Sequence, residues 1–185
     1  MRLFIAIEIP DETKKALIEA QRSLKSSGVD ASWPRPEGIH LTLKFLGEAP
    51  ESKVPEIMNN LRQAATGTGP LRLAISGAGA FPGLKNARVA WVGLSGDSEK
   101  LIRLQAAVEE AMVTIGFARE ERKFTPHLTL GRIKYIGSRE AWLRAFEAIK
   151  DIKLPAFDAA SVSLMQSELK PSGAVYTEIG RIELK

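Results

Sequence analysis

His40-Leu41-Thr42-Leu43 and His127-Leu128-Thr129-Leu130 are two copies of one tetrapeptide, and they contain both histidines of the 185-residue chain. In each copy apolar and polar residues alternate, which is the pattern of a half-buried β-strand. The leucines therefore face the core, and the histidine and threonine share the opposite face. Histidine is the side chain whose ordinary pKa suits acid–base chemistry near neutral pH. The duplication predicts one site that uses both histidines as a pair.

The segments around the two motifs repeat one order of elements. In the first half, strands are expected at 2–9 and 71–75, and helices at 11–26 and 52–65. In the second half, strands are expected at 88–94 and 161–166, and helices at 97–115 and 138–150. A glycine-rich stretch at 77–83 is interpreted as a flexible connection, and a turn at 170–173 as the start of a last strand, 175–184.

The repeat predicts one bilobal domain over residues 1–185, formed by an internal duplication of roughly 1–86 and 87–185. A pseudo-two-fold arrangement of the lobes would bring His40 and His127 face to face across a groove. The apolar stripe of the 97–115 helix is interpreted as core.

Composition narrows the function classes. The chain has no cysteine, which excludes disulfides, thiol catalysis and thiolate metal sites. Its net charge of +4 slightly favours an anionic partner and is compatible with RNA. No apolar run approaches the roughly 20 residues that a membrane span needs, and residues 1–10 read as a strand entering a turn rather than as a signal peptide. We expect a cytoplasmic protein with no membrane partner.

Two opposed imidazoles suit phosphodiester chemistry. One can donate a proton to a leaving oxygen while the other takes a proton from the nucleophile, and two hydroxyls can hydrogen-bond the phosphoryl oxygens. Two histidines without a neighbouring carboxylate or thiolate make a poor zinc site, so no metal is predicted. A serine hydrolase fits poorly because no serine nucleophile with an oriented base is evident.

Four further side chains are candidates for substrate binding. Arg132 could clamp a phosphate, although simple alternation puts it on the leucine face; a bulge or strand end at Gly131 could turn it round. Lys44 shares the parity of the first histidine and could add positive charge, with a solvated lysine as the alternative. Phe45 and Phe124 could stack a base, with core packing as the favoured alternative.

The paired HxTx motifs, within the stretches Trp33–Gly47 and Phe124–Arg132, resemble the 2H phosphoesterase superfamily. Within it, the chain is most similar to the bacterial and archaeal RNA 2',3'-cyclic phosphodiesterases, also called 2'-5' RNA ligases. The resemblance covers essentially the whole chain. It implies a bilobal α+β fold, with antiparallel sheets lining a central groove and helices outside.

The resemblance also implies an activity: hydrolysis of an RNA 2',3'-cyclic phosphate end to a 2'-phosphomonoester, with 2'-5' ligation as the reverse reaction. His40 would be the proton donor and His127 the acceptor, with Thr42 and Thr129 holding phosphoryl oxygens and Arg132 assisting. No cofactor is implied, and we expect a monomer. From the residues alone the two histidine roles remain exchangeable, since the motifs are nearly symmetric.

Two other functions remain open at this point. The same site could act on a small cyclic nucleotide or on an ADP-ribose cyclic phosphate. Alternatively, the chain could be a non-catalytic module whose histidines only hydrogen-bond the phosphate at an RNA end.

Overall fold

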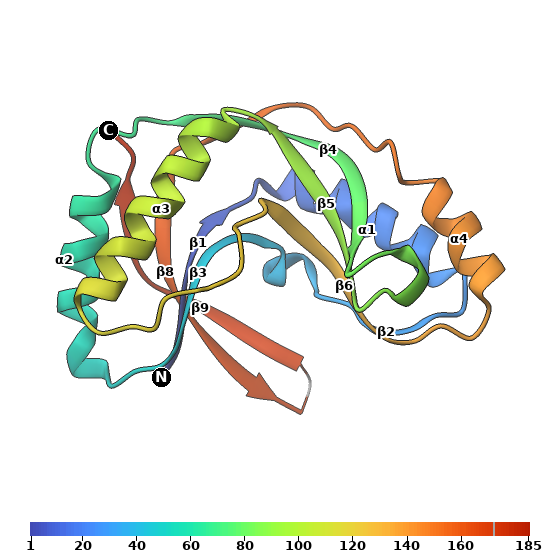
Figure 1. The fold of residues 1–185 in the computed structure, drawn as a ribbon, viewed down its shortest axis with the longest axis horizontal. Helices are drawn as coiled ribbons and strands as arrows, with labels where there is room; N and C mark the ends of the chain where they lie inside the picture. Colours follow the sequence, from blue (N-terminus) through green and yellow to red (C-terminus); the bar gives the residue numbers. More distant parts are fainter. Residues whose placement is uncertain (172) are drawn as a thin grey trace.

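Two antiparallel sheets form the framework of the computed structural model, which describes residues 1–171 and 173–185 (Figure 1). Sheet A has the strand order β3-β1-β8-β9, with bounds His40–Glu48, Arg2–Glu8, Ser161–Lys170 and Gly173–Glu183. Sheet B has the order β2-β6-β5-β4-β7, with bounds Asp30–Ser32, His127–Tyr135, Val89–Gly96, Leu71–Phe81 and Phe157–Ala159. Ser172, in the turn predicted between the last two strands, lies outside the described residues.

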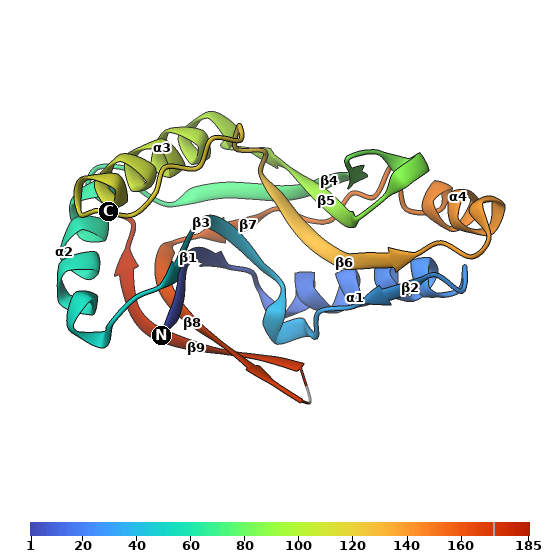
Figure 2. The same cartoon turned by 60° about the horizontal axis from the view of Figure 1, so that its bottom comes forward.

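Helices cover the outer side of each sheet (Figures 1 and 2). The helices α2 (Val54–Ala65) and α3 (Ser98–Thr114) pack on each other and on sheet A. The helices α1 (Asp11–Lys25) and α4 (Arg139–Glu147) pack on each other at sheet B, where α1 contacts β6. The predicted cap of α4 is present, since the Ser138 side chain accepts a hydrogen bond from the amide of Ala141. The mixed architecture and the antiparallel sheets agree with the expected fold class.

The hydrophobic core lies between the helices and the inner faces of the sheets. The apolar stripe predicted for α3 is buried there, as are the alternating leucines and isoleucines of β1; the residues concerned are Leu101, Leu104, Val108, Met112, Leu3, Ile5 and Ile7. The opposite face of β1 carries Phe4 and Ala6, which form a small separate cluster with Met165 and Tyr176. This second face of sheet A is the one that the first histidine shares.

The two lobes do not coincide with the two halves of the chain, 1–86 and 87–185. Sheet A takes β1 and β3 from the first half but β8 and β9 from the second. Sheet B takes β5, β6 and β7 from the second half but β2 and β4 from the first. Helices are exchanged as well, because α1 packs on β6 and α3 packs on β3. Each sheet nevertheless repeats one order, in which the histidine strand lies beside the strand that opens its half.

The glycine-rich stretch at 77–83 is not the flexible connection that we predicted. Strand β4 continues through it to Phe81, with a register shift between Ile75 and Ala78. Glycine is needed at position 79 because a Cβ atom there would lie 2.2 Å from the ring of Trp91. The short strands β2 and β7 were also missed, because three residues carry too little periodicity to recognise.

No helix in the described part of the chain combines the length and apolarity that a membrane crossing requires.

Candidate active site

The two motif strands meet where the lobes adjoin. β3 is an edge strand of sheet A, and the His127 end of β6 extends beyond its short neighbour β2, whose pairing starts at Arg132. Cα atoms of β3 and β6 come within 8 Å of each other. The fold therefore brings together two strands that stand far apart in the sequence.

Each motif strand contains a β-bulge at the same position. In β3, Thr42 pairs with Ala6 and Lys44 pairs with Ile5, so Leu43 is the extra residue. In β6, Thr129 pairs with Trp91 and Gly131 pairs with Ala90, so Leu130 is the extra residue. A bulge shifts the alternation of side chains by one position. As a result, the fourth residue after each histidine faces inward and the fifth shares the histidine's face.

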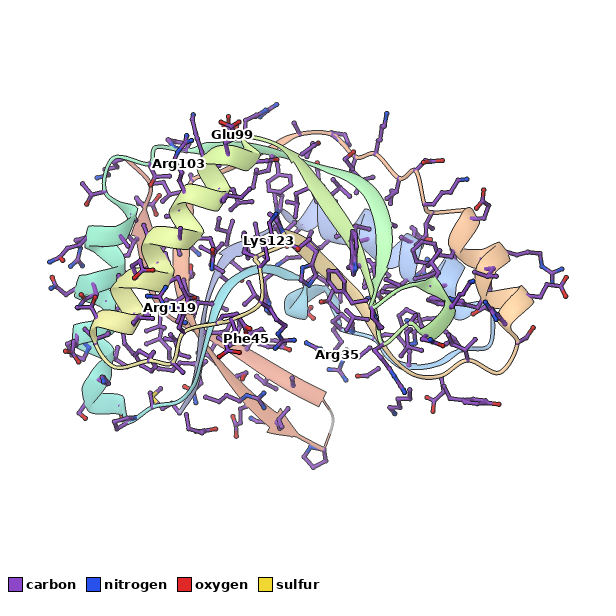
Figure 3. All side chains as sticks on the ribbon, in the orientation of Figure 1. Arg35, Phe45, Glu99, Arg103, Arg119 and Lys123 are labelled. Atoms are coloured by element: carbon purple, nitrogen blue, oxygen red, sulfur yellow. The ribbon has the colours of Figure 1, made fainter. Side chains whose placement is uncertain are left out.

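The bulge brings Phe45 and Arg132 to the active-site face. Phe45 is paired with Phe4, its ring lies 6.0 Å from that of Phe4, and it is 62% exposed, so it does not pack in the core. Arg132 is exposed, and the bulge, whose extra residue is Leu130 rather than the predicted Gly131, resolves the difficulty with its parity. Figure 3 shows Phe45 in the region between the lobes, together with Arg35 and Lys123. Phe124, by contrast, packs against the core.

Lys44 is not on the face of His40, and our expectation for it was wrong. The bulge turns its side chain inward, where its Nζ lies 2.6 Å from Glu109 Oε1 of α3 and donates to the carbonyl of Ala118 at 2.8 Å. Glu109 Oε1 also accepts the backbone N–H of Glu120. Lys44 therefore joins β3 to α3 and to the segment that leads to the second motif.

His40 is held in an aromatic and largely buried environment. Its ring centroid lies 4.7 Å from that of Phe4 and 5.2 Å from that of Tyr176. Burial lowers the pKa of His40 to about 4, with a further contribution from the positive charge of Lys14. Lys14 is paired at 3.0 Å with Glu8, which stands directly opposite His40 in the sheet. Within the described residues, His40 Nδ1 is buried and makes no hydrogen bond.

His127 differs from His40 in the partner of its Nδ1 nitrogen. This Nδ1 lies 2.6 Å from the carbonyl oxygen of Thr125, and because a carbonyl can only accept, Nδ1 must carry the proton. The neutral ring then keeps a lone pair on Nε2. Burial lowers the pKa of His127, the bond to Thr125 opposes this, and the charge of Arg132 adds to the lowering. The rings of Phe81 and Trp91 lie 5.1 and 6.2 Å from it.

The site can supply a proton acceptor, a proton donor, two hydroxyls and one guanidinium. Thr42 and Thr129 follow their histidines on the same face, opposite Ala6 and Trp91 of the neighbouring strands. Burial lowers the pKa of both imidazoles from the ordinary value, which favours the neutral form of each ring in the free enzyme. Among the described residues, no three His, Cys, Asp or Glu side chains are grouped as metal ligands.

The sequence pattern did not reveal the aromatic rings that surround the two histidines. Phe4 and Trp91 lie on strands that neighbour the motifs, and Phe81 lies in the stretch interpreted as a loop. The alternation of β1 could have placed Phe4 on the face opposite the buried Leu3 and Ile5, but only strand pairing shows that this face meets His40.

Comparisons with known proteins assign the chain to a family. The family model of the LigT-like phosphoesterases matches the chain twice, at residues 7–91 and 92–176. An RNA 2',3'-cyclic phosphodiesterase of Methanothermobacter thermautotrophicus is 33% identical over 179 residues, covering 97% of this chain and 96% of that protein. An RNA 2',3'-cyclic phosphodiesterase of Thermotoga maritima is 35% identical over 178 residues, covering 95% of this chain and 91% of that protein.

Solved structures show the same fold. The protein TT0787 of Thermus thermophilus superposes with a TM-score of 0.83 at 29% identity, over 100% of this chain and 98% of that one. E. coli LigT complexed with 3'-AMP superposes with a TM-score of 0.77 at 24% identity, over 99% of this chain and 97% of that one. The second likeness concerns the fold alone.

Proposed function

The chain belongs to the LigT-like phosphoesterase family, and from that membership and the geometry of the site we propose that it hydrolyses RNA 2',3'-cyclic phosphate ends. The product is a 2'-phosphomonoester beside a free 3'-hydroxyl. One observation carries the proposal: the two motif strands, each with a β-bulge at the same position and with a histidine and a threonine on one face, lie next to each other between the lobes.

His127 is the base in this proposal. Its Nδ1–H is committed to the Thr125 carbonyl, so Nε2 is free to take a proton from the attacking water. The water oxygen forms a bond to phosphorus as the P–O3' bond breaks. The same Nδ1 bond stabilises the imidazolium that results, because a carbonyl oxygen is a good acceptor for its proton.

His40 is the acid: its doubly protonated ring gives the Nε2 proton to the departing O3' and is left as a neutral imidazole. Burial and Lys14 disfavour the charged ring in the free enzyme. A bound phosphate brings negative charge and counteracts both effects, which makes His40 a donor only when substrate is present.

The remaining side chains bind the substrate. Thr42 and Thr129 donate hydrogen bonds to the non-bridging phosphoryl oxygens, and Arg132 neutralises the charge that grows on them. Phe45, exposed on the same face, stacks against the terminal base.

Ligation to a 5'-hydroxyl uses the same groups. A 5'-hydroxyl in place of water attacks the cyclic phosphate, His127 takes its proton, and cleavage of P–O3' leaves a 2'-5' linkage. Both histidines belong to one chain, so a monomer suffices, and an RNA substrate is met in the cytoplasm.

The test is turnover of an RNA oligonucleotide that ends in a 2',3'-cyclic phosphate. We expect His40→Ala and His127→Ala each to lower kcat by at least about 100-fold, the usual contribution of a positioned acid or base. Tyr135→Ala, at the exposed far end of the same strand as His127, is the matched control. Phosphorus NMR identifies the product as the 2'-monoester.

Three results would contradict the proposal. Activity retained in both single variants would remove the histidines from the mechanism. A 3'-phosphate product would show that O2', and not O3', is the leaving oxygen. Tight binding of the RNA end with no turnover at any pH would identify a binding module instead. A mononucleotide 2',3'-cyclic phosphate is assayed in parallel, and faster turnover of it would favour the small-nucleotide alternative.

A further inference from the structure

A side chain from outside the strand forms a hydrogen bond with the bulge in β6. A bulged residue is left out of the pairing with the neighbouring strand, so its backbone groups need other partners. Leu130 is the extra residue of the β6 bulge, and its carbonyl accepts a hydrogen bond from Gln21 Nε2 at 2.9 Å. Gln21 belongs to α1, which comes from the other half of the chain.

Gln21 ties the bulge to the segment that covers it. The same Nε2 donates to the carbonyl of Pro34 at 2.9 Å, so both hydrogens of the amide are used. The neighbouring Trp33 lies against Gly131, where a Cβ atom would come within 2.7 Å of the ring. Gln21 is 1% exposed, which excludes a role in direct contact with substrate.

We propose that Gln21 is the positioning residue for Arg132: its amide fixes the bulge at Leu130 and so holds the guanidinium on the face of His127. The bulge is what reverses the parity of Arg132, and Gln21 is the side chain that bonds the bulged carbonyl. The charge of Arg132 acts on His127 in this arrangement. The inference rests on the proposed function only in assigning Arg132 to the phosphate.

The other motif has a counterpart that serves as a control. Leu43 is the extra residue of the β3 bulge, and its carbonyl accepts a hydrogen bond from Gln105 of α3 at 3.3 Å. Each bulge is thus bonded by a glutamine from a helix of the opposite half. Gln105 supports the strand of Phe45, so its loss should leave Arg132 in place.

The first experiment follows His127 by NMR and does not depend on activity. The chain has two histidines, so their titrations can be assigned with His40→Ala. Arg132→Ala should raise the pKa of His127, because a positive charge that lowers it is removed. Gln21→Met should raise it too, since the guanidinium is no longer held, and the double variant should titrate like Arg132→Ala alone. Gln105→Met should leave the titration unchanged.

The second experiment is a double-mutant cycle on kcat/KM with the cyclic-phosphate RNA. We expect Gln21→Met and Arg132→Ala each to lower kcat/KM about tenfold, within the range that misplacement of a binding group by about 1 Å produces. The double variant should be no slower than Arg132→Ala, because Gln21 acts through Arg132. Thermal melts establish that each variant is folded, and Gln21→Ala, which lets water reach both carbonyls, replaces Gln21→Met if that variant is not.

The outcomes separate the positioning role of Gln21 from the phosphate-binding role of Arg132. A His127 titration in Gln21→Met that matches the wild type overturns the positioning role, and so do effects on kcat/KM that multiply in the double variant. If Arg132→Ala shifts the titration but not kcat/KM, the phosphate role of Arg132 in the proposed function fails, and the NMR titration alone decides the role of Gln21.

Discussion

Lys44→Met tests whether Lys44 stabilises the fold through its buried ion pair or binds the substrate. The Lys44 and Glu109 side chains are 2% and 9% exposed, and Nζ lies 2.6 Å from Oε1. Methionine fills a similar volume but leaves the carboxylate of Glu109 in the interior. Its Oε2 already has no hydrogen-bond partner among the described residues, so only the N–H of Glu120 would remain.

The expected loss of stability follows from that geometry. Breaking a buried ion pair from one side costs about 3–5 kcal/mol, because an uncompensated charge stays buried. The surviving bond from Glu120 favours the lower end, about 3 kcal/mol. For a chain of this size, 1 kcal/mol corresponds to roughly 2–4 °C, so the melting temperature should fall by about 6–12 °C.

Urea unfolding followed by circular dichroism measures the change, with Lys44→Met/Glu109→Gln as the matched control. That pair removes both charges and keeps an acceptor for Glu120, so we expect it to recover about 2 kcal/mol. The kcat/KM of folded Lys44→Met should equal that of the wild type. A fall of tenfold or more in kcat/KM with a melting temperature within about 2 °C of the wild type would refute the structural interpretation.

Three further outcomes are expected. Burial lowers the pKa of His40 to about 4 from 6.5, so the unfolded chain binds the proton more tightly than the folded chain. The free energy of unfolding should therefore drop by about 3 kcal/mol as the pH falls from 6.5 to 4. Urea unfolding at a series of pH values measures this drop, which should be smaller in His40→Asn. Gly131→Ala should cost about 1–3 kcal/mol by collision with Trp33, seen in melts and in tryptophan fluorescence. Phe45→Ala should raise KM for the RNA about tenfold through lost stacking, with an unchanged melting temperature because the ring is exposed.

The local pattern of the chain predicted most elements but not the behaviour of two of its strands. Periodicity located the helices and the motif strands within a few residues. Strict alternation, however, placed Lys44 on the active-site face and left Arg132 facing inward, because a bulge has no reliable signature in a single sequence. Gly131 gave a hint, since its missing side chain suggested an irregular strand. Leu43-Lys44 gave none.

The exchange of strands and helices between the lobes could not be read from the sequence either. Each half supplies the same kinds of element, so nothing in the local sequence pattern indicates which sheet β4 or β8 joins. Local propensity is the same for either arrangement, and only packing between the halves selects one. The glycine-rich end of β4 shows the same limit, because its strand conformation depends on the ring of Trp91 from the next strand.

The shared strands have a consequence for how such a chain can arise and diversify. A half-length polypeptide with the elements of residues 1–86 would lack a partner strand beside β1, whereas two copies that traded β4 would each regain the three-strand order that β3-β1-β8 and β6-β5-β4 share. In such an intertwined pair, one sequence would encode both motifs. Any substitution in one motif would therefore be present in the other as well. Fusion into a single polypeptide removes that constraint. Phe45 and Arg132 occupy the same place in their motifs, and there one copy carries a ring and the other a charge.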